Sequence, residues 1–79
     1  MKIKLLFFAA TADRSKTRSA EVELPSGSRV DHLAELVVAN YPALRDLRLV
    51  YAVNESYVSP SRPLNDGDEV AVFTPVSGG

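Results

Sequence analysis

The chain has 79 residues, which is enough for one domain. Nine Lys and Arg residues stand against ten Asp and Glu residues, and the net charge of -1 gives no support for nucleic acid or an anionic membrane as a partner. The sequence contains no cysteine, which excludes disulfides, thiolate metal sites and cysteine nucleophiles. An intracellular, cytoplasmic protein is therefore the simplest interpretation.

Two strands joined by a polar loop are predicted at the start of the chain. Residues 2–9 show a two-residue apolar period, and one face of this strand carries Ile3, Leu5, Phe7 and Ala9. Residues 18–24 alternate apolar and acidic side chains, whereas residues 11–17 are polar and are expected to form a loop. The pattern predicts an antiparallel hairpin. The N-terminal apolar run is shorter than the core of a typical signal peptide, so we interpret it as a strand.

A single main helix is predicted after the break at residues 25–27. Ser28 is a favourable N-cap residue, and Asp31 stands three residues later as its capping-box partner. Pro42 is expected to end the helix, and His32 falls on its polar face, where we expect a solvated side chain. The apolar stripe of this helix consists of Val30, Leu33, Ala34, Val37 and Tyr41.

The last third of the chain predicts a third strand over residues 49–54, a short return strand at residues 57–58 and a final strand over residues 69–73. Asp66-Gly67 is a turn signal, and Pro75 cannot donate a hydrogen bond to a strand ladder. The fold class is therefore α+β, with a mixed sheet of about five strands packed on one main helix. We expect the last strand beside the first, because both carry apolar residues on two faces.

The end of the chain is the one segment in which chemistry is expected, since a single histidine without cysteine predicts no metal site. Pro75 ends the last strand, and Val76, Ser77, Gly78 and Gly79 follow it. Glycine allows close approach of a backbone to another surface. Residues 1–74 are predicted to form the domain and residues 75–79 a flexible tail. Six extended residues reach about 20 Å, enough to present the Gly79 carboxylate to a partner's active site.

Three stretches carry a resemblance to a known family. The start Lys4–Ala9, the strand Ala52–Glu55 and the long run Leu64–Gly79 resemble the small subunit of molybdopterin synthase, the MoaD family. The run Asp-Gly-Asp-Glu-Val followed by Phe-x-Pro-Val-Ser-Gly-Gly is the specific part, although Thr74 stands where the family usually has a proline. The resemblance covers the whole chain and implies a ubiquitin-like β-grasp fold.

The resemblance also implies a sulfur-carrier mechanism. An ATP-dependent enzyme resembling ubiquitin-activating enzymes adenylates the Gly79 carboxylate, and a sulfur donor converts it to a thiocarboxylate. The tail then enters the large catalytic subunit of a heterotetrameric complex. There the sulfur builds the dithiolene of molybdopterin on a pyranopterin precursor, in molybdenum cofactor biosynthesis. No bound cofactor is implied, because the adenylate and the thiocarboxylate are covalent states of the tail itself.

A docking surface follows from the two-residue period of the first and last strands. If Leu5 and Phe7 face the helix, Leu6 and Phe8 point to the opposite side of the first strand. If Val70 and Val72 of the last strand also face the helix, Phe73 points to the same side of the sheet as Phe8. We therefore expect Phe8 and Phe73 to form an aromatic patch with Leu6, and this patch to dock the large subunit.

Several other functions fit the same Gly-Gly end. The chain could carry sulfur for thiamine synthesis or tRNA thiolation instead of for molybdopterin. It could also be a ubiquitin-like modifier joined to lysines through Gly79. The least specific alternative is an interaction domain with an inert tail.

Overall fold

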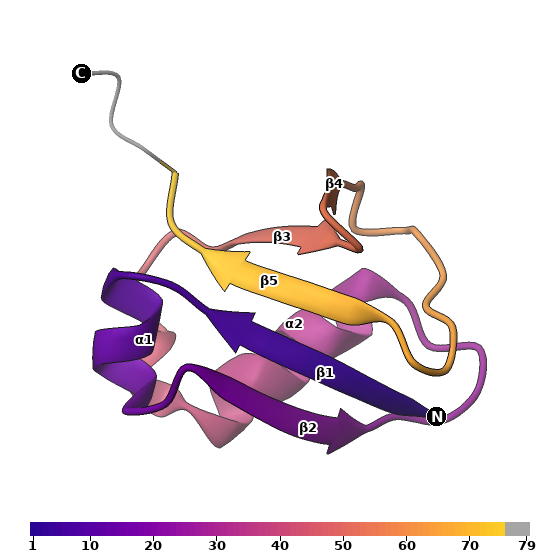
Figure 1. Cartoon of the computed structure of the whole chain (residues 1–79), viewed down its shortest axis with the longest axis horizontal. Coiled ribbons are helices and arrows are strands. Elements are labelled where there is room, and N and C mark those ends of the chain that lie inside the picture. The colour runs from indigo at the N-terminus through magenta and orange to yellow at the C-terminus, as the bar shows by residue number, and fades with distance from the viewer. Residues whose placement is uncertain (76–79) are drawn as a thin grey trace.

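A mixed five-stranded sheet with its main helix across one face forms the architecture (Figure 1). The computed structural model describes residues 1–75. In sheet order the strands are β2 (Ser19–Glu23), β1 (Lys2–Phe7), β5 (Glu69–Phe73), β3 (Val50–Val53) and β4 (Ser56–Tyr57). The helices are α1 (Ala10–Ser15), α2 (Val30–Asn40) and the short 3-10 helix η1 (Pro42–Leu44).

The strand register confirms both predicted neighbours of β1. β1 pairs antiparallel with β2, as a hairpin partner should, and parallel with β5. β5 pairs antiparallel with β3 on its other side, and β3 pairs antiparallel with β4. The α+β class with a mixed sheet is therefore confirmed, and β5 lies at the centre of the sheet.

The core lies between the sheet and α2. Alternate residues of β1 and β5 point into it, and the Phe7 ring meets the Tyr41 ring edge-on with centroids 5.1 Å apart. Leu44 of η1 is also fully buried, although the sequence pattern did not identify it. The members of the core are Ile3, Leu5, Phe7, Leu24, Val30, Leu33, Val37, Leu44, Val53, Leu64, Val70 and Val72.

The prediction of a loop over residues 11–17 is wrong, because residues Ala10–Ser15 form α1. β1 also ends at Phe7, two residues earlier than predicted, and Ala9 turns the chain with a φ of 49°. The helix has only six residues, too few for a helical apolar period to be recognised in sequence. It is held by tertiary contacts of a fully buried threonine, Thr11, instead of by an apolar stripe.

The predicted N-cap is also wrong. Helix α2 begins at Val30, and Ser28 donates its hydroxyl to the Pro25 carbonyl at 2.7 Å, closing the preceding turn. The first N–H groups of the helix find other acceptors: Val30 donates to the Arg62 carbonyl at 3.0 Å and Asp31 to the Pro60 carbonyl at 2.9 Å. Backbone from a distant segment therefore satisfies the groups that a serine cap usually satisfies.

The start of β5 is fixed by a buried carboxylate. Asp68 accepts the Asn65 N–H at 2.8 Å and the Asn54 side-chain amide at 3.0 Å, and Arg62 lies 3.6 Å away. Burial alone raises the pKa of Asp68, but these hydrogen bonds and the Arg62 charge outweigh it and hold the pKa below its usual value. Gly67, with a φ of 87°, completes the predicted turn.

We predict that Asp68→Asn lowers the free energy of unfolding by about 1–3 kcal/mol at neutral pH, since one part-buried donor loses its acceptor and the charge opposite Arg62 is removed. The folded-state pKa lies below the unfolded one, so the carboxylate stabilises the fold fully above the unfolded pKa and progressively less as pH falls through the folded pKa. The difference between variant and wild type should therefore shrink below about pH 4. Urea denaturation across this pH range measures it, and a difference that persists unchanged in acid contradicts the assignment.

Candidate functional site at the end of strand β5

The site is the place where the chain leaves the sheet. Because β1 and β5 are parallel, both end at the same edge, beside α1 (Figure 1). Thr74 and Pro75 follow the central strand directly, and Pro75 is exposed and has no N–H to continue the ladder. The predicted tail residues Val76, Ser77, Gly78 and Gly79 lie outside the described part of the chain.

Thr11 joins the two strand ends at this edge. Its Oγ1 accepts the Phe8 N–H at 2.9 Å and lies 2.9 Å from the Phe8 carbonyl. The same hydroxyl donates to the Val72 carbonyl at 2.7 Å. One fully buried side chain thus fixes the backbone that leads into Phe8 and the backbone that leads into the tail. Sequence reasoning missed this residue, because a lone threonine in a polar segment gives no signal.

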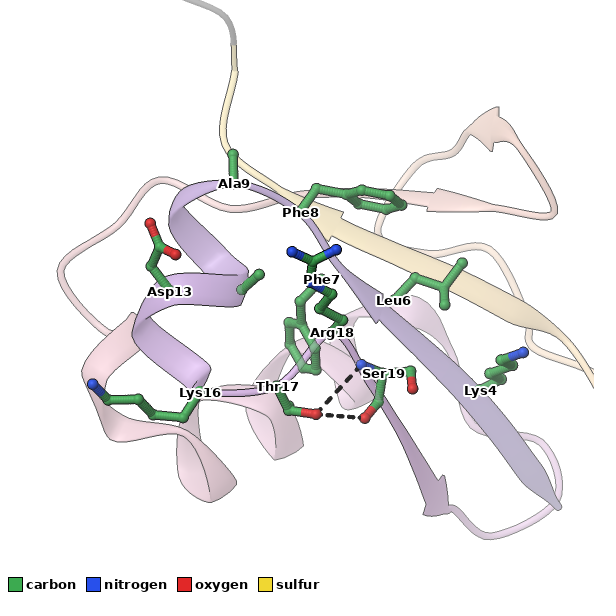
Figure 2. A pocket seen from close by; sticks show the side chains of 11 residues that line it. Lys4, Leu6, Phe7, Phe8, Ala9, Asp13, Lys16, Thr17, Arg18 and Ser19 are labelled. Atoms are coloured by element: carbon green, nitrogen blue, oxygen red, sulfur yellow. Dashed lines mark hydrogen bonds between the residues drawn. The ribbon is translucent and has the colours of Figure 1, made fainter.

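The face of the sheet opposite α2 carries an apolar surface that we call the aromatic face, defined by Leu6, Phe8, Tyr57, Ala71 and Phe73. The register pairs Leu6 with Ala71 and Val50 with Phe73. Directly paired residues share a side of the sheet, so these residues lie away from the buried Val70 and Val72. Figure 2 shows Leu6 and Phe8 on the side of β1 away from the Phe7 ring.

The aromatic face contains the two predicted rings, Phe8 and Phe73, and a third ring, Tyr57. Phe8 is 50% exposed and lies at the end of β1. Phe73 is half-buried, and its ring meets the Tyr57 ring edge-on with centroids 5.9 Å apart. Tyr57, which is 77% exposed, was not predicted as a site residue. Its position opposite Ala52 in the β3–β4 pair places it on this face, and the period of β4 alone could not have shown this because it depends on how β3 pairs with β4 and β5.

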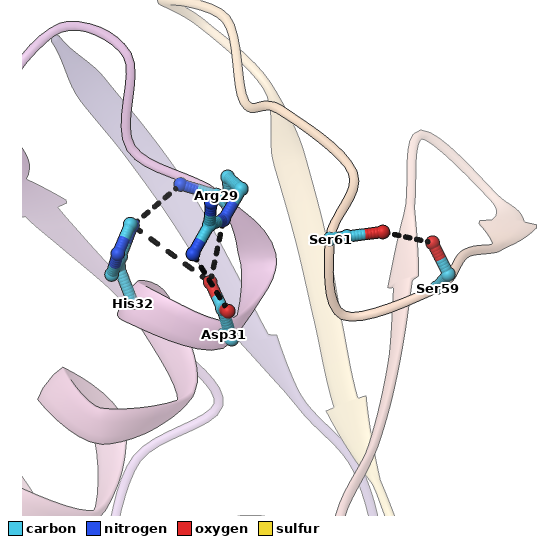
Figure 3. A network of polar contacts seen from close by, with 5 residues as sticks. All are labelled: Arg29, Asp31, His32, Ser59 and Ser61. Carbon is cyan, nitrogen blue, oxygen red and sulfur yellow. Dashed lines mark hydrogen bonds and ion pairs between the residues drawn. The ribbon is translucent and has the colours of Figure 1, made fainter.

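A second polar cluster lies at the start of α2, far along the chain from the tail (Figure 3). Arg29 pairs with Asp31 at 3.2 Å, and this hydrogen-bonded pairing lowers the pKa of Asp31. His32 is exposed, as predicted, and its Nδ1 accepts the Arg29 N–H at 3.0 Å. The cluster therefore shapes the helix start. Among residues 1–75, no group of three or more His, Asp or Glu side chains could hold a metal ion.

No helix in the described part of the chain is long and apolar enough to cross a membrane. The sheet order and the single long helix across one face together define a ubiquitin-like β-grasp protein.

The chain belongs to the ThiS family, whose model matches residues 5–79. It is 42% identical over 80 residues to the molybdopterin synthase sulfur carrier subunit of Escherichia coli strain K12, covering 98% of this chain and 99% of that one. It is 37% identical over 83 residues to the protein of the same name from Chlamydomonas reinhardtii, with both chains covered completely. A solved structure of a putative molybdopterin converting factor subunit 1 from Pyrococcus furiosus superposes with a TM-score of 0.91, at 32% identity over 96% of this chain and 99% of that one. The family expected from the sequence is confirmed.

Proposed function

We propose that this chain is the sulfur-carrier subunit of a molybdopterin synthase and that its Gly79 carboxylate is the group that carries sulfur. The observation that carries the proposal is the full-length match to sulfur carrier subunits, combined with a Gly-Gly pair a few residues after the central strand in sequence. The setting is the cytoplasm.

The chemistry starts from a carboxylate, which is a poor acyl donor because its charge resists attack. One carboxylate oxygen attacks the α-phosphorus of ATP, which forms an acyl adenylate and releases pyrophosphate. Hydrosulfide supplied by the donor then attacks the carbonyl carbon and AMP leaves, so that a carbon–sulfur bond replaces the carbon–oxygen bond to AMP with no change of oxidation state. The product is a thiocarboxylate whose sulfur is itself a nucleophile. The sulfur must come from a separate donor, because the chain has no cysteine of its own. A separate adenylating enzyme performs the first step.

The fold holds the start of the tail in a fixed position relative to the docking surface. Thr11 holds the ends of β1 and β5, so the tail root has a fixed place beside Phe8. The aromatic face docks the large catalytic subunit, and the tail crosses from this fixed point into the partner's active site. Tethering the sulfur makes its delivery effectively intramolecular once the complex forms.

Truncating the aromatic face should weaken docking without unfolding the domain. Phe8→Ala and Phe73→Ala are expected to lose about 2 kcal/mol or more of binding energy with the large subunit, as buried aromatic anchors do. Phe8 is half-exposed in the free chain, so Phe8→Ala should leave the free energy of unfolding nearly unchanged. Titration calorimetry and thermal melts separate the two effects. Wild-type affinity in both variants contradicts the docking surface but leaves the tail chemistry standing.

The function itself is tested by reconstitution. The thiocarboxylated chain, mixed with the large subunit and the pyranopterin precursor, should yield molybdopterin and regenerate the free carboxylate. A carrier for thiamine or tRNA thiolation would form the thiocarboxylate and yield no molybdopterin. A ubiquitin-like modifier, which the β-grasp fold also supports, would instead appear joined through Gly79 to lysines of other proteins.

A further inference from the structure

An open groove of about 680 Å³ lies beside Phe8, between β1, α1 and the start of β2 (Figure 2). Apolar side chains such as Leu6 and Ala12 line its floor. Lys4, Lys16 and Arg18 also line it, and all three are exposed. The groove therefore has apolar side chains with three cations around them. This local positive charge contrasts with the net charge of -1 of the whole chain.

The cations of this groove are not neutralised by the domain. Within residues 1–75, the side chains of Lys16 and Arg18 make no ion pair and no hydrogen bond. Lys4 reaches Glu69 only at 3.9 Å, and both side chains are largely exposed, a geometry that stabilises little. Asp13 is the single acidic residue among those that line the groove.

The backbone beneath two of these charges is nevertheless fixed. Lys16 ends α1 in the left-handed conformation, with a φ of 64°, and its N–H donates to the Ala12 carbonyl at 3.0 Å. The Arg18 carbonyl accepts the Phe7 N–H at 2.9 Å. The Arg18 side chain therefore leaves from a fixed point beside the end of β1, and the Lys16 side chain leaves from the C-terminal end of α1.

We propose that this groove receives a carboxylate-bearing segment of the large synthase subunit and so orients the carrier on its partner. This inference rests on the proposed function and names the chemistry of the partner surface. Leu6 and Phe8 belong both to the groove and to the aromatic face, so the two surfaces are continuous. A partner segment that fills the groove removes water from Arg18 and Lys16, which line it.

Charge complementarity is what selects an acidic occupant. Burying a cation without a partner costs several kcal/mol, so a tight complex needs carboxylates opposite Lys16 and Arg18. The charges lie at one side of the aromatic face, around the groove between β1, α1 and the start of β2. The positive charges thus determine how the carrier is rotated on the surface of its partner, an orientation that apolar contacts alone define poorly.

Charge reversal in the full-length chain tests the inference. Arg18→Glu and Lys16→Glu should each lower the affinity for the large subunit about tenfold or more in ~50 mM salt, mainly through slower association. The loss should shrink in ~0.5 M salt, where charges are screened over a few ångströms. The matched control is Arg45→Glu, an exposed arginine at the end of η1 with no ion pair among the described residues; it should bind within about twofold of wild type.

The outcomes separate this inference from the proposed function. If Arg18→Glu and Lys16→Glu bind like wild type in low salt while Phe8→Ala binds weakly, the groove has no acidic occupant and the inference is overturned alone. If wild type itself neither binds a large subunit nor yields molybdopterin, the proposed function is overturned.

The absence of cysteine allows a direct second measurement. Lys16→Cys provides a single thiol for a photoreactive cross-linker within the complex. The cross-linked peptide of the large subunit should contain closely spaced Asp or Glu residues. A peptide without carboxylates, or a complex that forms and gives no cross-link from position 16, contradicts the inference.

Discussion

Removing Gly79, or adding one residue after it, is expected to abolish sulfur transfer and to leave the folded domain unchanged. One residue moves the terminal carboxyl group by about 3.3 Å, whereas a misplacement of about 1 Å already costs on the order of a hundredfold in rate. The last strand, β5, stops at Phe73, and all the core members found among residues 1–75 precede Thr74. Molybdopterin formation in the reconstituted system measures the loss.

A thermal melt is the control for these tail variants. Both should unfold at the wild-type temperature, because no buried contact among residues 1–75 is altered. Wild-type molybdopterin yield from the chain that lacks Gly79 would remove the carrier assignment, and a lowered melting temperature would place the tail in the folded domain.

Leu5→Ala is expected to cost about 2–5 kcal/mol of stability. Leu5 is fully buried at the centre of the core, paired with Val70 on the parallel strand β5. Removing its side chain leaves a cavity beneath both central strands. A domain of this kind is stable by only about 5–15 kcal/mol, so the variant should unfold at a much lower urea concentration.

The neighbouring leucine supplies a matched control for this core substitution. Leu6 has the same size, but it lies half-buried on the aromatic face. Leu6→Ala should therefore cost less than about 1 kcal/mol of stability, and its main effect should be on binding to the large subunit. Equal losses of stability in the two variants contradict the assignment of the two faces of β1.

The elements with a clear apolar period were predictable from the sequence. The last strand was predicted over residues 69–73 and observed at Glu69–Phe73. Its place beside β1 followed from apolar side chains on both of its faces, since a strand buried on two sides belongs at the centre of a sheet. The helix stripe was also recognisable, because Val30, Leu33 and Val37 recur at helical spacing and are buried.

The elements held by tertiary hydrogen bonds were not predictable in this way. α1 is held in place by the Thr11 hydroxyl, which accepts the Phe8 N–H and donates to the Val72 carbonyl. Val72 lies 61 residues away in the sequence. The start of α2 uses carbonyl groups of the 60–62 segment, so Ser28 is free to close the turn before the helix. Local propensity identifies neither the contact of Thr11 with Val72 nor that of the α2 start with the 60–62 segment, because both join residues that are distant in sequence.

The family of the chain was predicted from the sequence more fully than the surface around the tail. The Gly-Gly end and its resemblance led to the family, which the comparisons confirm. The predicted surface around the tail was incomplete, because the sequence assigned Tyr57 only to a short return strand and not to the docking surface. The contact between Tyr57 and Phe73 depends on the pairing of β3 with both β4 and β5, which a reading of each strand alone does not give.

The most direct test of the account is the intact mass of the chain after incubation with the adenylating enzyme, ATP and a sulfur source. We predict a mass increase that corresponds to the exchange of one oxygen for one sulfur, located by fragmentation at Gly79. The increase should require ATP and should be absent from the chain that lacks Gly79. An unchanged mass in the presence of a competent adenylating enzyme, or sulfur found at any other residue, contradicts the claim that the Gly79 carboxylate carries the sulfur.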